Sequence, residues 1–283
     1  MVNNQKLMDF LPPLSNFRNE TSGTFTSYRI KQPQIEDTER PALVFLHGFN
    51  GSSKSWAYQF AHFTSQTVIA IDAPGFGESQ SVEGGMVAIA DEVAALIANL
   101  VNGKAVIIGH SMGGMLAQVL GATHPNICQA IILSCTHKGR AQPVGSPLGA
   151  AVQERIQQRE VMDDASYGAL RVGKMLSGKI DRQIVAFLAA VAGEIRVEGI
   201  RCGGFAMQYL DTSPFLDKIT APVAIFTGGD DVVVEPDAAA ALKAGLPQAH
   251  HWLLADVGHA PYCEDAASFN ATIEAFLDSV LAG

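Results

Sequence analysis

The chain has 283 residues, of which 48% are hydrophobic and 17% charged, and its formal net charge at pH 7 is -9. A chain of this length buries a substantial core, so we expect one large α/β domain or two small domains, without extensive disorder. This negative net charge argues against nucleic acid or an anionic membrane surface as the main partner. The longest apolar segment, 184–193, is shorter than the roughly 18–20 residues of a membrane span, so we expect no membrane contact.

The cysteines and the first residues of the chain indicate the cellular compartment in which the protein is expected. The opening segment, MVNNQKLMDFLPPLSN, lacks the continuous apolar run of a secretory signal. The cysteines form no CxxC pair and no metal-ligand spacing with histidine; they are Cys128, Cys135, Cys202 and Cys263. We therefore expect reduced cysteines, no metal and a cytoplasmic protein.

Short apolar runs alternate with helix-length segments along the chain. Strands are expected at 24–31, 42–46, 67–71, 105–108, 129–133, 223–226 and 251–254. Helices are expected between and after them at 54–63, 87–101, 112–123, 236–244 and 266–281. This alternation predicts parallel β-α-β units in a doubly wound sheet.

The alternation stops between 137 and 213, where no buried strand is expected. Helical segments are expected there instead, at 150–161, 166–176, 182–191 and 195–210. A stretch of about 75 residues is too long for a plain crossover. We therefore expect a core domain formed by 1–136 and 214–283 and a helical cap at 137–213. The cap would cover the carboxyl ends of the strands, where open α/β sheets bind ligands.

The residues GHSMGG, 109–114, lie between an expected strand and an expected helix. They contain the pattern G-x-S-x-G, which in that setting puts a strained serine on a sharp turn with its hydroxyl in a cleft. The glycines leave room where the helix passes close to the strand. A capping serine in a Gly-rich turn is the alternative, and we interpret Ser111 as a nucleophile.

A serine hydroxyl needs a base at neutral pH, and that base needs an orienting carboxylate. His259, in DVGHAP after the last expected strand, is the candidate base. Asp231, in GGDD after the strand at 223–226, is the candidate acid, and the adjacent Asp230 remains an alternative. The loop after the strand at 129–133 reads SCTH and has no carboxylate, which favours Asp231.

An acyl-transfer site also needs two N–H groups aimed at the developing oxyanion. We expect them from Met112, next to the serine, and from Phe49 in the loop HGFNGSS. Asn50 is a candidate substrate contact, and Cys135 and Met112 are candidates for the acyl pocket. Candidate partners of a substrate carboxylate are Lys138, Arg140 and Arg171.

Five motifs, in this order along the chain, resemble those of the α/β-hydrolase superfamily: HGF at 47–49, DAPGFGES at 72–79, GHSMGG at 109–114, GGDD at 228–231 and GHAP at 258–261. The resemblance implies an eight-stranded, mostly parallel sheet flanked by helices, a helical cap and no cofactor. Haloalkane dehalogenases and epoxide hydrolases of this fold carry aspartate at the nucleophile position, so Ser111 disfavours both. The segments 204–207 and 217–219 loosely resemble the 3-oxoadipate enol-lactonase group.

We therefore expect a serine hydrolase that cleaves a carboxylic ester or lactone of a small molecule through an acyl-enzyme on Ser111. A C–C bond hydrolase acting on a diketone-type ring-fission product is one alternative. The short oxyanion loop, and His110 before the serine, favour esters or lactones over that reaction. A catalytically silent hydrolase-fold binding protein is the alternative of another class. The expected partner is the small-molecule substrate, with the chain a monomer or homodimer.

Overall fold

A single sheet organises the chain in the computed structural model, which describes residues 7–33, 40–173, 175–178 and 180–281. Its strands are β1 (Leu14–Arg18), β2 (Phe25–Lys31), β3 (Ala42–Leu46), β4 (Val68–Ile71), β5 (Ala105–His110), β6 (Cys128–Ser134), β7 (Val223–Gly228) and β8 (His250–Leu254). The spatial order is β1-β2-β4-β3-β5-β6-β7-β8. β2 pairs antiparallel with β1 and β4, and the other neighbours are parallel. The predicted eight-stranded, mostly parallel sheet is confirmed.

The seven apolar runs of the sequence all become strands, β2 to β8. The edge strand β1 was not expected, because its sequence, LSNFR, has neither a continuous apolar run nor a regular alternation. It is ordered by antiparallel pairing with β2, a long-range effect that no local pattern reports.

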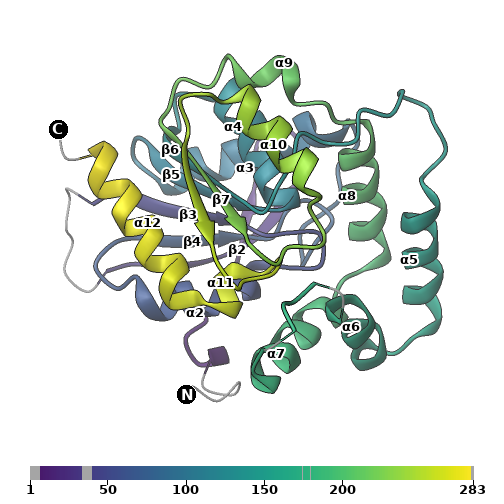
Figure 1. Cartoon of the computed structure of the whole chain (residues 1–283). Helices are drawn as coiled ribbons and strands as arrows, with labels where there is room; N and C mark the ends of the chain where they lie inside the picture. The colour runs from purple at the N-terminus through teal and green to yellow at the C-terminus, as the bar shows by residue number, and fades with distance from the viewer. Residues whose placement is uncertain (1–6, 34–39, 174, 179, 282–283) are drawn as a thin grey trace.

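Helices cover both faces of the sheet (Figure 1). One face is covered by α3 (Gly85–Leu100), α4 (Met112–Thr123) and α10 (Pro236–Gly245). The other is covered by the short η1 (Ser53–Trp56), α2 (Ala57–His62) and α12 (Ala266–Leu281). The helix expected at 54–63 is therefore split into η1 and α2. Among the described residues, no helix is both long and apolar enough to cross a bilayer.

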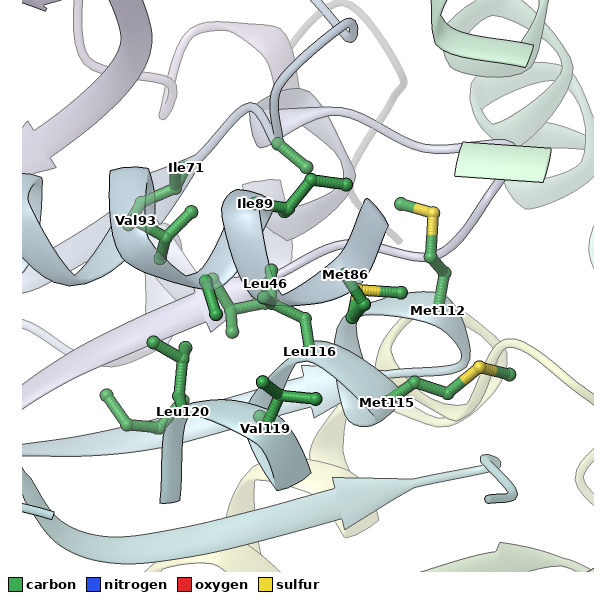
Figure 2. Close-up of a cluster of buried hydrophobic side chains, with 14 of the residues drawn as sticks. Leu46, Ile71, Met86, Ile89, Val93, Met112, Met115, Leu116, Val119 and Leu120 are labelled. Carbon is green, nitrogen blue, oxygen red and sulfur yellow. The ribbon is translucent and has the colours of Figure 1, made fainter. Parts of the chain in front are cut away.

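The core has one layer on each side of the sheet. In β3, Leu43 and Phe45 pack in the layer with α2 and α12, whereas Val44 and Leu46 pack in the layer with α3 and α4. Successive side chains of a strand point to opposite faces, so a strand covered on both sides needs a continuous apolar run. In Figure 2, Leu46 lies among the apolar side chains of α3 and α4.

Between β6 and β7 the chain forms an insertion at one side of the sheet, which contains four helices ahead of the short α9 (Figure 1). They are α5 (Ala150–Val161), α6 (Asp164–Val172), α7 (Arg182–Gly193) and α8 (Val197–Tyr209), and we call them the helical insertion. A β-bridge between Gly139 and Asp211 joins its two ends. Its apolar residues extend both core layers, Val152 and Ile200 on one side and Val172 and Leu188 on the other. The insertion is thus packed on the sheet core rather than tethered to it.

Two short helices complete the chain: α9 (Ser213–Leu216), before β7, and α11 (Pro261–Glu264), after β8. Neither was expected from the sequence. Each has proline in its first turn, where the fixed φ of proline suits a helix start. Helix α11 follows the GHAP motif directly, so it determines where that loop can run.

Candidate active site

Ser111 occupies the sharp turn between β5 and α4. Its backbone has φ 52° and ψ -114°, a conformation that costs a non-glycine residue energy. The turn requires glycine on both sides. A Cβ on Gly109 would lie 2.2 Å from the carbonyl oxygen of Gly113, and a Cβ on Gly113 would lie 2.1 Å from the carbonyl oxygen of Leu46. These glycines let α4 start directly against β5 and β3, which presents the serine at the edge of the sheet.

The structure brings Ser111 together with His259 and Asp231. His259 Nε2 lies 3.1 Å from Ser111 Oγ, and His259 Nδ1 lies 2.9 Å from Asp231 Oδ2. The His259 and Asp231 side chains are 4% and 6% exposed. A carboxylate only accepts hydrogen bonds, so we assign the proton to Nδ1. Nε2 is then an acceptor facing the serine hydroxyl.

Asp231 is held by its own loop after β7. Its Oδ1 accepts the backbone N–H groups of Val233 at 2.8 Å and Val234 at 3.1 Å. Burial opposes ionisation of this carboxyl, but the hydrogen bond and charge of His259 and the two N–H groups outweigh it and lower the pKa of Asp231. The neighbouring Asp230 is exposed and is fixed through its backbone, which donates to Val257. Of the two candidate acids, only Asp231 contacts the histidine.

The loop that carries His259 is fastened at several backbone atoms. Glu264 accepts the N–H groups of Gly258 at 3.0 Å and of Ala260 at 2.8 Å, one on each side of the histidine. The same carboxylate accepts the N–H of Ser177, which follows α6 in the chain, at 2.9 Å. The N–H of His259 itself donates to the carbonyl of Met175 at 2.9 Å. The position of the histidine thus depends on α11 and on the segment between α6 and α7.

The expected oxyanion loop follows β3 and lies against Ser111. A Cβ on Gly48 would be 2.9 Å from His110 Cδ2 and 3.2 Å from the Ser111 Cβ, so only glycine allows this approach. Phe49 comes next in this loop. Met112 is the first residue of α4, and the first N–H groups of a helix have no acceptor within the helix. Both candidate donors therefore border the serine.

The DAPGFGES segment supports this loop from outside the cavity. The His47 ring accepts the N–H of Ala73 at 3.0 Å and contacts the carbonyl of Gly48 at 2.8 Å. The Asp72 carboxylate accepts the N–H of Ser53 at 2.6 Å, at the far end of the oxyanion loop. These contacts give the segment a structural role.

His110 precedes the nucleophile but points away from solvent. Its ring centroid lies 4.8 Å from that of His259 and 4.9 Å from that of Tyr262. Burial, and then the nearby charge of His259, lower the pKa of His110 well below its ordinary value. The His110 ring therefore packs against His259 and favours the uncharged state there.

A cavity of about 370 Å³ opens over Ser111, His259 and the oxyanion loop. Asn50 and Arg140, both candidate substrate contacts, line it, and so does Arg171. The insertion supplies further lining residues that sequence reasoning did not single out, among them Arg155, Gln158, Leu170, Met175 and Leu188. Arg155 lies in an expected helix, but which face of that helix meets the core depends on tertiary packing.

Two residues expected in the acyl pocket lie elsewhere. Cys135 is buried under the site, with φ 46°, and its Sγ lies 4.0 Å from the carbonyl of Gly258. The Met112 sulfur packs toward Gly203 of α8, and Met115 lines the cavity instead. The displacement of Met112 follows from the turn at Ser111, which directs the first side chain of α4 into the core layer with α3 (Figure 2).

Among the described residues, one trio has the proximity that a metal site needs: Cys135, Asp231 and His259, whose ligand atoms lie within 4.8 Å of one another. Asp231 and His259 already bond to each other, and burial raises the pKa of the Cys135 thiol well above its ordinary value. We interpret Asp231 and His259 as a hydrogen-bonded pair with Cys135 beside them.

Residues 41–266 match the family described as the alpha/beta hydrolase fold, and the chain belongs to this family. Among curated proteins it is similar to the mouse (Mus musculus) sn-1-specific diacylglycerol lipase ABHD11, with 26% identity over 260 residues, 85% of this chain and 82% of the relative.

Two solved structures show the same fold over nearly the whole chain. The enol-lactonase from Burkholderia xenovorans LB400 superposes with a TM-score of 0.80 at 22% identity, covering 93% of this chain and 99% of that one. A thermophilic esterase from Thermogutta terrifontis superposes with a TM-score of 0.77 at 23% identity, covering 95% and 99%.

Proposed function

We propose that this protein is a serine hydrolase that cleaves a carboxylic ester or lactone of a small molecule through an acyl-enzyme on Ser111. The observation that carries the proposal is the continuous chain of contacts from Asp231 through His259 to the Ser111 hydroxyl. A strained serine on a glycine-flanked turn, with a buried base and acid behind it, is the arrangement that acyl transfer needs. The lipase, enol-lactonase and esterase relatives support the same reaction class.

In the first half of the reaction, Ser111 Oγ attacks the carbonyl carbon while its proton passes to His259 Nε2. The charge that appears on the histidine is stabilised by Asp231, already ionised at neutral pH because its pKa is low. The carbonyl oxygen becomes negative and accepts hydrogen bonds from the N–H groups of Phe49 and Met112. The start of α4 adds the positive end of its helix dipole.

In the second half, His259 gives its proton to the leaving alkoxide or enolate, and the acyl group stays on Ser111. Water then loses a proton to His259 and attacks the acyl carbon, which releases a carboxylic acid and restores the serine. In a lactone the leaving oxygen belongs to the same molecule, so a single hydroxy acid leaves. A cavity of about 370 Å³ suits a small substrate.

The test is hydrolysis of p-nitrophenyl butyrate and a panel of lactones by the wild type and by Ser111→Ala. We expect turnover by the wild type and a loss of at least about 1000-fold in kcat for the variant. Ser268→Ala, an exposed serine on α12, is the matched control and should keep wild-type activity. An organophosphonate should label the wild type once, on Ser111, as read by mass spectrometry. A folded wild type without turnover on either class would overturn the proposal in favour of the C–C hydrolase or the silent binding protein.

A further inference from the structure

The cavity over Ser111 is cationic, although the protein as a whole is acidic. Three arginines line it, Arg140, Arg155 and Arg171, against one carboxylate, that of Glu154. The whole chain carries a formal net charge of -9. Positive charge gathered in one cleft of an acidic protein needs a local reason, because a buried or half-buried cation is stable only with suitable partners.

Arg155 sits beside the oxyanion loop. Its Nη1 donates to Asn50 Oδ1 at 2.9 Å, and its guanidinium carbon lies 5.1 Å from the centre of the Phe49 ring. Both partners are neutral, so they orient the guanidinium without forming an ion pair with it. Asn50, which follows the expected oxyanion donor Phe49, thus holds the positively charged Arg155 side chain at the cavity.

Arg171 has a similar environment on α6. Its Nη2 donates to Gln158 Oε1 at 2.7 Å, and its guanidinium carbon lies 5.3 Å from the centre of the Tyr167 ring. Its Nε is buried, and no described residue accepts a hydrogen bond from it. A buried donor left without an acceptor is costly, which points to an acceptor that arrives with a ligand.

No described carboxylate lies within 4.0 Å of the guanidinium nitrogens of these three arginines. Burial lowers the pKa of Arg155, and the positive charges of Arg171 and Arg140 lower it further. Arg159, one turn after Arg155 on α5, is different: it pairs with Asp164 at 2.7 Å. The insertion can therefore neutralise an arginine, but it does not do so at the cavity.

We propose that Arg155 and Arg171, with Arg140, form a subsite for a carboxylate carried by the substrate. The reaction is then hydrolysis of an ester or lactone that also bears a free carboxylate, a refinement that rests on the proposed function. The balance is that of any ester: water is consumed, the acyl–oxygen bond breaks, and the products are a carboxylic acid and an alcohol. The substrate carboxylate is bound and is not changed.

Physical chemistry favours this ligand. A guanidinium presents N–H groups in a planar fork that matches the two oxygens of a carboxylate, and such bonds are stronger than neutral ones. Asn50 and Gln158 each occupy one nitrogen and hold the fork in place, which leaves the other nitrogens for the ligand. Because Arg155 and Arg171 are half-buried, their attraction for a carboxylate is screened less than at an exposed surface; Arg140 is exposed.

The test compares two substrates of nearly equal size. One is the p-nitrophenyl half-ester of adipic acid, which has a free carboxylate, and the other carries a carboxamide in its place. The readout is the ratio of kcat/KM for the acid over that for the amide, corrected for uncatalysed release. We expect a wild-type ratio of about 100, the effect of one well-placed charged pair.

Arg155→Gln and Arg171→Gln should each lower this ratio about tenfold, and Arg155→Lys should give an intermediate ratio because it keeps the charge without the fork. Arg182→Gln is the matched control: it removes the same charge from an exposed arginine of α7 that is not part of the cavity wall, and it should keep the wild-type ratio. Circular dichroism checks that each variant folds. If Arg155→Gln does not, Arg171→Gln carries the test.

The outcomes separate this inference from the proposed function. A wild-type ratio near one, with both esters hydrolysed and both activities lost in Ser111→Ala, overturns the carboxylate subsite and leaves the serine hydrolase standing. A high ratio that survives in both glutamine variants overturns the assignment to Arg155 and Arg171. If neither ester is hydrolysed, and the panel of other esters and lactones also fails, the proposed function falls and this inference falls with it.

Discussion

Glu264 Oε1 accepts the backbone N–H of Ala260 at 2.8 Å, which fixes the chain one residue after His259. Its other oxygen accepts the N–H groups of Gly258 and of Ser177. One carboxylate therefore holds both sides of the proposed base and joins that loop to the helical insertion. A glutamate five positions after a histidine is not by itself a signal, so the sequence did not predict this role.

Glu264→Gln should lower kcat for p-nitrophenyl butyrate about tenfold and leave KM nearly unchanged. The amide keeps one acceptor oxygen but presents a donor to the other N–H groups, so the histidine loop shifts relative to Ser111, and a small misplacement is enough to slow proton transfer. Steady-state kinetics measures both constants. The exposed Glu274→Gln on α12 is the control. An unchanged kcat, or a change confined to KM, would argue against a positioning role.

Asp231→Asn should reduce kcat by about 10,000-fold, because an amide can favour the wrong histidine tautomer and cannot stabilise a charged imidazole. Its neighbour provides the control. Asp230 is exposed and has only a backbone bond to Val257, so Asp230→Asn should keep wild-type activity. The same ester assay distinguishes the two. Equal losses in both variants would mean that the charge of the loop matters rather than the contact of Asp231 with His259.

The strain at Ser111 predicts a stability difference between two inactive variants. Ser111→Gly and Ser111→Ala both remove the hydroxyl, but only glycine adopts φ 52° and ψ -114° without steric cost. We expect the glycine variant to be more stable than the alanine variant by about 1 kcal/mol, after the entropy that glycine adds to the unfolded chain. Urea denaturation of both proteins measures the difference. Equal stability would show that the turn stores no strain.

Two buried histidines predict how stability depends on pH. Burial lowers the pKa of His47 and lowers that of His110 well below its ordinary value. In the unfolded chain both side chains bind protons near pH 6.5. The unfolded state then binds more protons than the folded state, so the free energy of unfolding should fall as the pH drops from about 7.5 to about 5.5.

The lowered pKa of Asp231 also stabilises the folded state. This contribution to the free energy of unfolding is lost only at more acidic pH, as the pH falls through the pKa that Asp231 has in the folded protein. Urea denaturation at several pH values gives the slope. His110→Gln should make the slope shallower, because it removes one of the two buried histidines. A free energy of unfolding that is flat over this range would contradict the prediction.

The candidate site residues that could be predicted from the sequence are those that directly follow a predicted strand. Ser111, Asp231 and His259 each follow an apolar run that must become a buried strand, and the carboxyl ends of parallel strands meet at one edge of the sheet. The segments between those runs could be recognised as helical, but not oriented. The inward face of α5, and with it Arg155, is set by packing against α8 and the oxyanion loop, which no local periodicity encodes.

The displacement of Cys135 has a related cause. The sequence places it directly after a strand, in the position where a functional side chain would be expected, and the prediction put it in the acyl pocket. Its backbone enters the left-handed region at φ 46°, which turns the thiol toward the Gly258 carbonyl below the site. Such a turn is rare for cysteine and follows from the fit of this loop between its neighbours, so the residue type gave no indication of it.

The bond from the His259 N–H to the Met175 carbonyl joins the proposed base to the wall of the cavity. If residues 175–177 swing away from the core, the histidine amide loses its acceptor and Glu264 loses Ser177. A displacement of this part of the cavity wall would therefore leave His259, the proposed base, less firmly held.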